Sequence, residues 1–172
     1  SSTPTPIPTP IPTSPPVTVT PTSPPSSSNL LTNPDFETSP TANYFTHTNG
    51  IASFSWATDT ARSPSHSLKI VSTGSSSSLS RWLTKNASIT TFAGKTYKGT
   101  VYVKTTGVTG SATLTVLFLE NGTNAYKGGS SVSTTNTNGV WKSLSVTSPA
   151  APATTFVRFE MRLNGPGPAG FD

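Results

Sequence analysis

The sequence predicts an all-β fold in which roughly eight to ten short antiparallel strands form a β-sandwich. Segments in which apolar and polar residues alternate recur along most of the chain, and this two-residue period is typical of half-buried strands. Clusters of Gly, Asn, Ser and Pro separate these segments, as expected of the turns between strands. No segment shows the 3.6-residue apolar period of an amphipathic helix, so a helical fold is not expected.

Residues 1–28 differ in composition from the rest of the chain, because they contain ten prolines, many Thr and Ser, and no charged residue. Alternation of Thr and Pro favours extended polyproline II and removes backbone donors, so this segment cannot build a core of its own. We predict a Pro/Thr-rich extended tether of roughly 85 Å, at about 3.1 Å per residue. Residues 29–172 then form one domain, with a length that suits a single hydrophobic core.

The domain is expected to begin with a short apolar strand at residues 29–31, followed by a turn at Asn33-Pro34-Asp35. The polar passage at residues 38–50 lacks a regular pattern and is expected to be a surface loop. Further strands are predicted from alternation, or from apolar runs between turn residues. They occupy residues 51–57, 68–71, 79–83, 98–104, 112–120, 125–134, 140–147 and 154–163, and residues 89–97 lead into the strand at 98–104.

Composition argues against several functional classes. The chain has no cysteine, which excludes a disulfide framework and a thiolate metal site. Its net charge of +5 is spread over eleven basic residues from Arg62 to Arg162 rather than gathered on one element, so no nucleic-acid binding is expected. The apolar runs are too short to cross a bilayer, so no membrane insertion is expected.

The sequence gives no sign of a catalytic site, and we expect a noncatalytic protein. A glycosidase needs two carboxylates across a cleft, whereas the six acidic residues here fall mostly in turns or at strand ends. The two histidines, His47 and His66, lie in separate loops without metal-ligand spacing. Motifs for a serine nucleophile, a phosphate loop or a zinc site are also missing. The acidic residues are Asp35, Glu37, Asp59, Glu120, Glu160 and Asp172.

Three short motifs resemble a known family. They are the opening Asn29-Leu30 with Asn33 and Phe36-Glu37, the step Gly94-Lys95-Thr96-Tyr97 before an alternating strand, and the pair Phe171-Asp172. Together they resemble the secreted carbohydrate-binding modules grouped around families 4, 9, 16 and 22, which are β-sandwich jelly rolls. The resemblance implies a jelly roll for residues 29–172, an extracellular location (secreted or cell-surface), and a polysaccharide or other glycan as partner.

The same resemblance implies a structural calcium ion. Glu37 and Asp172 stand where these modules place side-chain ligands, and backbone carbonyls near Asn33 and Ser67-Leu68 would complete a shell of oxygen atoms. The alternative is that both carboxylates cap turns and face solvent. In these modules the aromatic-Asp pair opens the last strand, whereas this sequence ends at Asp172, so we expect that strand to be either cut off or supplied by another copy of the chain.

Sugar recognition requires an aromatic ring on the C–H face of a pyranose, beside charged or amide groups that bond its hydroxyls. Residues 97–104 and 156–163 both offer such a mixed face opposite an apolar one, and the outer face of one sheet is the glycan groove in the resembling modules. The alternative is a set of cross-strand ion pairs on a solvated sheet, which bind nothing. By position, the candidates for carbohydrate binding are Trp82, Tyr102, Lys104, Arg158, Glu160 and Arg162.

The remaining aromatic residues divide into core and rim. Trp56 and Trp141 are expected to fill the interior of the sandwich. Tyr44, Phe45 and Tyr126 are expected in or near loops, where they would rim a site.

A second hypothesis is a structural role. The tract Val17, Thr18, Val19 and Thr20 alternates within residues 1–28, and such a tract can add as a strand to the edge of a neighbouring sheet. Together with a missing last strand, it favours a subunit of an extracellular filament or surface layer that assembles with copies of itself. The sequence thus leaves two hypotheses open, a carbohydrate-binding module and a filament subunit.

Overall fold

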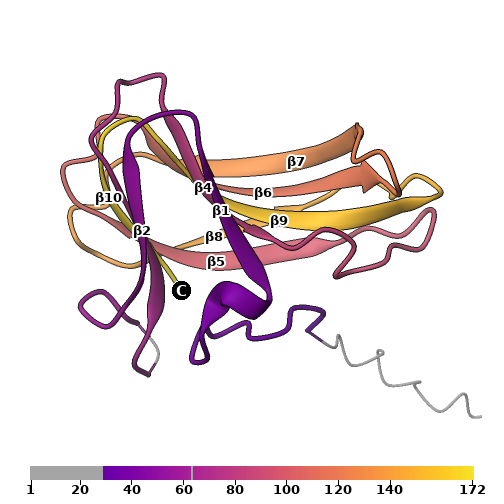
Figure 1. The fold of residues 1–172 in the computed structure, drawn as a ribbon, viewed down its shortest axis with the longest axis horizontal. Coiled ribbons are helices and arrows are strands. Elements are labelled where there is room, and N and C mark those ends of the chain that lie inside the picture. The colour runs from indigo at the N-terminus through magenta and orange to yellow at the C-terminus, as the bar shows by residue number, and fades with distance from the viewer. Residues whose placement is uncertain (1–28, 63) are drawn as a thin grey trace, which may run out of the picture.

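The computed structural model describes residues 29–62 and 64–172, which form an all-β fold with one short 3₁₀-helix (Figure 1). The tether predicted for residues 1–28, with the tract Val17, Thr18, Val19 and Thr20, lies outside the described residues. The part of the chain that the structure describes contains no helix with the length and hydrophobicity of a membrane span. The elements are η1 (Pro40–Ala42), β1 (Tyr44–Thr48), β2 (Ala52–Ala57), β3 (Ser67–Ser72), β4 (Leu79–Thr84), β5 (Lys98–Thr105), β6 (Ser111–Glu120), β7 (Tyr126–Thr134), β8 (Lys142–Thr147), β9 (Thr155–Asn164) and β10 (Gly167–Phe171).

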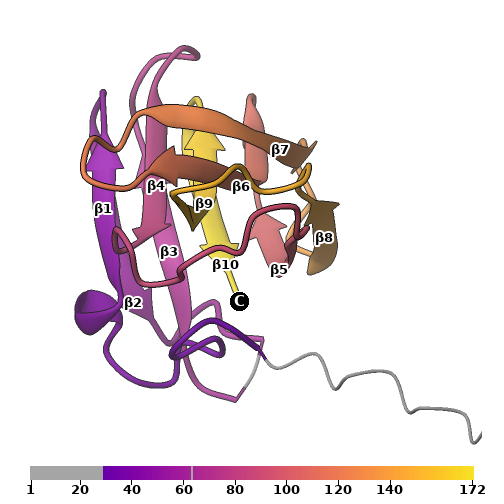
Figure 2. The same cartoon turned by 90° about the vertical axis from the view of Figure 1, so that its right-hand side faces the viewer.

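The strands form two five-stranded antiparallel sheets that stack as two layers (Figures 1 and 2). Sheet A has the order β1-β4-β9-β6-β7, and sheet B has the order β2-β3-β10-β5-β8. Most neighbours within a sheet are distant in sequence, so the chain crosses repeatedly between the layers, as in a jelly roll. The predicted all-β sandwich is confirmed.

The core lies between the two sheets and is filled by alternate residues of each strand. In β9, Val157, Phe159, Met161 and Leu163 are buried on the inner side. Trp82 and Phe54 meet edge to face there, with ring centroids 5.7 Å apart. Full burial of a large apolar side chain stabilises a fold by about 1.5–3 kcal/mol. The buried residues therefore fix the register of each strand, and the residues that alternate with them point away from the core.

The N-terminal part of the domain differs from the prediction. Residues 29–31 form no strand, whereas β1 lies within the passage that the sequence predicts to be a loop. β1 pairs with β4 along its whole length, and Tyr44 is buried against Phe36 with ring centroids 5.4 Å apart. Non-local pairing and aromatic packing therefore define this strand, in a stretch whose local pattern is polar.

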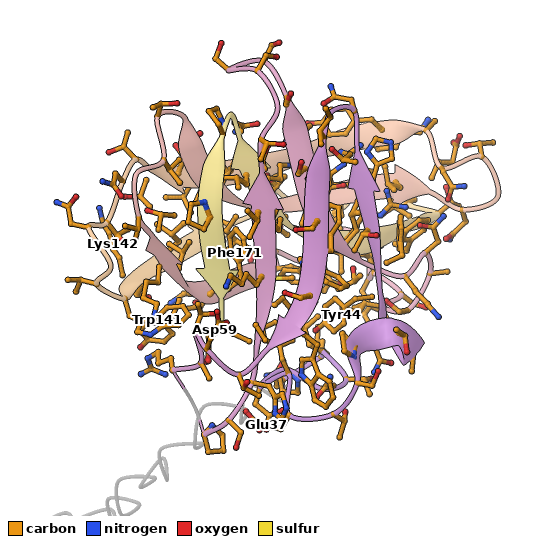
Figure 3. The ribbon with its side chains drawn as sticks, turned by 60° about the vertical axis from the view of Figure 1, so that its left-hand side comes forward. Glu37, Tyr44, Asp59, Trp141, Lys142 and Phe171 are labelled. Carbon is orange, nitrogen blue, oxygen red and sulfur yellow. The ribbon has the colours of Figure 1, made fainter. Side chains whose placement is uncertain are left out.

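The residues up to Phe171 form a strand that the sequence does not predict, whereas the expected absence of a strand after Phe171-Asp172 stays a prediction. Residues 167–171 form β10, which lies between β3 and β5 in the middle of sheet B; it is the yellow strand in Figure 3. Residues 167–171 include two glycines and one proline. Because both residue types are rare in strands, β-propensity does not predict a strand here. A Cβ at Gly170 would lie 3.3 Å from Oγ1 of Thr60, which is a tight contact and favours glycine there. Strand addition by residues 17–20 stays a prediction, since those residues lie outside the described part of the chain.

Phe171 tests the contribution of β10 to stability. Its side chain is fully buried between the sheets, so Phe171→Ala should lower the free energy of unfolding by about 3–5 kcal/mol, measured by urea denaturation. Val140→Ala, at a largely exposed site, should change that free energy by less than about 0.5 kcal/mol. Equal effects of the two substitutions would contradict a central position for β10.

Candidate binding surface

Three arginines gather around one glutamate on the outer face of sheet A. Because the alternate residues of β9 fill the core, Arg158, Glu160 and Arg162 point away from it. In the adjacent β4, Arg81 stands opposite Arg162 and Leu83 stands opposite Glu160. We call the surface formed by Arg81, Arg158, Glu160 and Arg162 the arginine face.

Glu160 is enclosed by the arginines and is only 1% exposed. Its Oε2 accepts hydrogen bonds from Nη1 of Arg81 at 3.2 Å and from Nε of Arg162 at 2.8 Å, and Nη2 of Arg162 lies 2.6 Å away. Nη1 of Arg158 lies 3.8 Å from Oε1. Three guanidinium charges therefore meet one carboxylate, which leaves an excess of two positive charges.

Arg158 connects the charged cluster to an aromatic floor. Its guanidinium carbon lies 5.5 Å from the ring centroid of Phe45 and 6.0 Å from that of Phe156, within the range of cation–π attraction. Nη2 of Arg158 donates a hydrogen bond to Oδ1 of Asn86, and Nδ2 of Asn86 donates to Oδ1 of Asn124 at 3.1 Å. The loops after β4 and β6 thus meet at this end of the face. Burial lowers the pKa of Arg158. The negative charge of Glu160 partly offsets this decrease, and the positive charge of Arg81 adds to it.

Two donors in the cluster remain unsatisfied. Nε of Arg81 and Nε of Arg158 are buried and have no hydrogen-bond partner among the described residues. A buried donor without an acceptor costs about 1–3 kcal/mol. Two such donors in one ion-pair network call for a physical explanation.

The outer side of sheet A continues from Arg162 to a buried threonine, an exposed serine and one exposed ring. Arg162 stands opposite Thr113, which pairs in turn with Ser133 of β7. At the far end, Tyr126 pairs with Leu119 and is 67% exposed. Guanidinium groups offer fixed donors, and an exposed tyrosine offers an apolar ring, which together suit a ligand with oxygen atoms on a ring scaffold.

The structure brings together three of the predicted residues, Arg158, Glu160 and Arg162, and adds Arg81. The prediction that Trp82 faces outward is wrong: Trp82 is 6% exposed, and its Nε1 donates a hydrogen bond to the carbonyl of Lys69 at 3.3 Å. Both faces of β4 carry apolar residues, so alternation alone does not decide which one is buried. The residue of β4 that belongs to the cluster is Arg81, which directly precedes Trp82 in the sequence.

Tyr102 and Lys104 lie on the outer face of sheet B, on the side of the sandwich opposite the arginine face, because Val101 and Val103 fill the core. The guanidinium of Arg62 lies 3.6 Å above the Tyr102 ring, and Nζ of Lys104 lies 5.1 Å from the Trp141 ring. Alternation shows that a residue faces outward, but it does not show to which sheet its strand belongs. The predicted set is therefore divided between two surfaces.

The other aromatic predictions fare unevenly. Trp141 is partly exposed on the side of sheet B that Figure 3 shows, and Trp56 is 37% exposed, so neither lies in the core. Tyr44 is buried rather than at a rim, whereas Phe45 faces the arginines and Tyr126 is exposed on sheet A.

Glu37 joins two loops at the base of the sandwich. Its Oε1 accepts hydrogen bonds from the backbone N–H of Ser65 at 3.1 Å and of His66 at 3.0 Å, and Oε2 lies 3.3 Å from Nδ1 of His66. The His66 ring stacks on Trp56 at a centroid distance of 3.9 Å. Nε1 of Trp56 donates a hydrogen bond to the carbonyl of Phe36 at 2.6 Å, so Trp56 is also bound to the segment that carries Glu37.

The predicted calcium ligands remain a prediction. Oδ2 of Asp172 accepts a hydrogen bond from the backbone N–H of Arg62 at 2.8 Å, so this carboxylate, like that of Glu37, has a backbone N–H donor. Among the described residues, no group of three or more His, Cys, Asp or Glu side chains is placed to hold a metal ion. A site there would depend on the two carboxylates and on backbone carbonyls.

Comparison with known proteins rests on structure. No protein-family model and no curated protein sequence matches the chain. Among solved structures, the family 11 carbohydrate-binding module from Clostridium thermocellum, in complex with a β-1,3-1,4-mixed-linked tetrasaccharide, matches with a TM-score of 0.58. The match has 11% sequence identity and covers 80% of this chain and 89% of that one. The chain therefore shares the β-sandwich jelly-roll fold of that module.

Two larger proteins share this fold in part. One is the arabinose-bound α-L-arabinofuranosidase of family GH51, with a TM-score of 0.64, 19% identity and 83% of this chain covered. The other comprises the CBM22-1–GH10 modules of endo-1,4-β-D-xylanase 10B from Clostridium thermocellum, complexed with xylohexaose, with a TM-score of 0.53, 17% identity and 74% of this chain covered. The match spans a quarter of the length of each of these two chains.

The Glu37 contacts predict a pH dependence of stability. Partial burial raises the pKa of Glu37, but the backbone N–H groups of His66 and Ser65 and the His66 side chain outweigh it, so the pKa lies below its ordinary value of 4.5. A lowered pKa in the folded state stabilises the fold above that ordinary value, and this stabilisation is lost as the pH falls through the lowered one. Glu37→Gln should therefore unfold more easily than the unsubstituted protein at neutral pH.

The difference between the two proteins should shrink as the pH falls below 4.5 and vanish once the pH is well below the lowered pKa of Glu37, where both carry a neutral side chain at this position. Urea denaturation in the presence of EDTA, at several pH values, measures this difference without any contribution from a metal ion. A difference that stays constant from neutral to acid pH would contradict the assigned role of the Glu37 charge.

Proposed function

We propose that this chain is a noncatalytic, extracellular module that binds polysaccharide through the arginine face. The observation that carries the proposal is the position of Glu160, a buried carboxylate on the outer side of a sheet, with three guanidinium groups fixed around it. The carbohydrate-binding-module fold supports it, as do the oligosaccharides complexed with the matched xylanase and family 11 structures.

The alternative to a binding surface is a set of ion pairs that serves stability alone. Exposed ion pairs on sheets contribute about 0–1 kcal/mol and remain solvated. Glu160 is instead withdrawn from water, and desolvation of an ion costs several kcal/mol unless its partners are well placed. Such an arrangement is better explained as preorganisation, because it fixes the rotamers of long side chains that would otherwise lose entropy on binding.

Two substitutions on opposite faces test the proposal. Arg162→Gln should weaken retention in affinity electrophoresis on the polysaccharide that binds most tightly by about tenfold, which is about 1.4 kcal/mol. Tyr102→Ala, on the outer face of sheet B, should leave retention within about twofold of that of the unsubstituted protein. The gels contain xylan, mixed-linkage β-glucan, galactan, polygalacturonate and carrageenan.

Thermal unfolding of both variants shows whether they keep the fold. Loss of retention by Tyr102→Ala with normal retention by Arg162→Gln would place binding on sheet B and refute the role of the arginine face. Retention on none of the polysaccharides would refute carbohydrate binding as the function.

We also propose that Glu37 and Asp172 hold a structural calcium ion, a proposal supported by their match to the family motif. Carboxylate oxygens are the ligands that calcium prefers, and a carboxylate has about four lone-pair sites, which the N–H donors at Glu37 do not exhaust. Calcium should raise the melting temperature relative to EDTA, since a ligand at about 100 times its Kd stabilises by about 2.7 kcal/mol. Glu37→Gln should abolish this increase; an unchanged melting temperature in the unsubstituted protein would refute the site.

A further inference from the structure

We propose that the arginine face selects polysaccharides that carry carboxylate or sulfate groups over neutral ones. This inference rests on the proposed function and names the ligand class of the same surface. It follows from the charge balance, the exposure of the guanidinium groups and the balance of donors and acceptors on that face.

The positive charge on the arginine face is not neutralised by the rest of the described chain. Asp59 pairs with Lys69 at 2.5 Å, and Glu120 pairs with Lys127 at 3.0 Å. Glu37 contacts Ser65 and His66 at the base of the sandwich. Asp172 follows β10 in sheet B, where it exchanges backbone hydrogen bonds with Tyr102 of β5. Asp35 lies in the N-terminal turn. Of the carboxylates in the described residues, Glu160 is thus the one that meets the three arginines.

The three guanidinium groups are partly exposed, so their excess positive charge can act on a ligand. The side chains of Arg81 and Arg162 are each 24% exposed, and that of Arg158 is 14% exposed. They are shielded from most of the solvent but still reach the surface. A charge in this position interacts more strongly with a ligand than one on an open surface, because less water screens it.

Among the described residues, His47 is a further titratable group in contact with the face, since its Nδ1 lies 3.4 Å from Nη2 of Arg81. A histidine can add positive charge but no negative charge, so it does not reduce the excess. The loop of Asn86 contributes an amide whose Oδ1 already accepts a hydrogen bond from Arg158.

Donors outnumber acceptors on this face. Each guanidinium has five N–H donors, whereas Glu160, the charged acceptor, is enclosed by its partners. A neutral sugar has hydroxyls that must donate as well as accept, which this cluster does not match. Carboxylate and sulfate oxygens accept without donating, and the guanidinium fork fits them in pairs of parallel hydrogen bonds.

The decisive experiment compares polysaccharides that share a backbone and differ in charge. Polygalacturonate and its fully methyl-esterified form are one such pair, and κ-carrageenan and its desulfated form are a similar pair for sulfate. Isothermal titration and affinity electrophoresis should show binding to a charged member about tenfold or more tighter than to its neutral counterpart. The pair that responds identifies the anionic group, and the affinity should fall as ionic strength rises.

A pair of arginine substitutions controls for net charge. Arg158→Gln and Arg62→Gln each remove one positive charge, but Arg62 lies over Tyr102 on the opposite sheet. The first should reduce the preference for the charged polysaccharide, and the second should leave it unchanged. Equal loss in both variants would mean that general attraction to a basic protein, and not this face, causes the preference.

Other results overturn the inference in distinguishable ways. Equal affinity for charged and neutral members would refute the preference for acidic glycans while leaving polysaccharide binding intact. Binding to none of the polysaccharides would refute both. Equally tight binding of single-stranded oligo-dT would show that the face recognises polyanions in general rather than acidic glycans.

Discussion

The alternation of β9 is the constraint on which the rest of the structure depends. β9 lies in the middle of sheet A and pairs with β4 on one side and with β6 on the other. Its inner residues fill the core, and its outer residues form most of the arginine face. A shift of one residue would bury Arg158, Glu160 and Arg162 and expose the apolar set, so core packing fixes the register of the charged cluster.

Glu160 shows why such coupling is useful. Three guanidinium groups on adjacent strands repel one another, and a single carboxylate beneath them offsets part of that repulsion while limiting their rotamers. Two further carboxylates would complete the neutralisation and leave no attraction for an anion. The cluster is therefore ordered but not neutral, which differs from the balanced ion pairs Asp59–Lys69 and Glu120–Lys127 elsewhere on the molecule.

Sequence reasoning recovers what depends on local period and fails where pairing is non-local. The all-β sandwich and the shared face of Arg158, Glu160 and Arg162 follow from two-residue alternation. The division of Tyr102 and Lys104 from that face does not, because it depends on which strands pair.

Two further errors have local causes. Trp82 lies in a strand with apolar residues on both faces, so hydrophobicity does not identify its inner side. β10 consists mainly of glycine and proline, and its partners β3 and β5 lie far away in the sequence. Such a strand is recognisable only when the space between its partners is known.

The two outer faces of the sandwich differ in how their binding groups are used. On sheet B, Arg62 covers the ring of Tyr102 and Lys104 approaches that of Trp141, so the chain's own cations already occupy these aromatic groups. On sheet A, Tyr126 is largely exposed and the arginines outnumber their carboxylate partner. A ligand on sheet B must displace internal contacts before it gains any, whereas a ligand on sheet A adds contacts to groups already fixed in position. This difference, rather than the number of aromatic or charged residues on each side, favours sheet A as the binding surface.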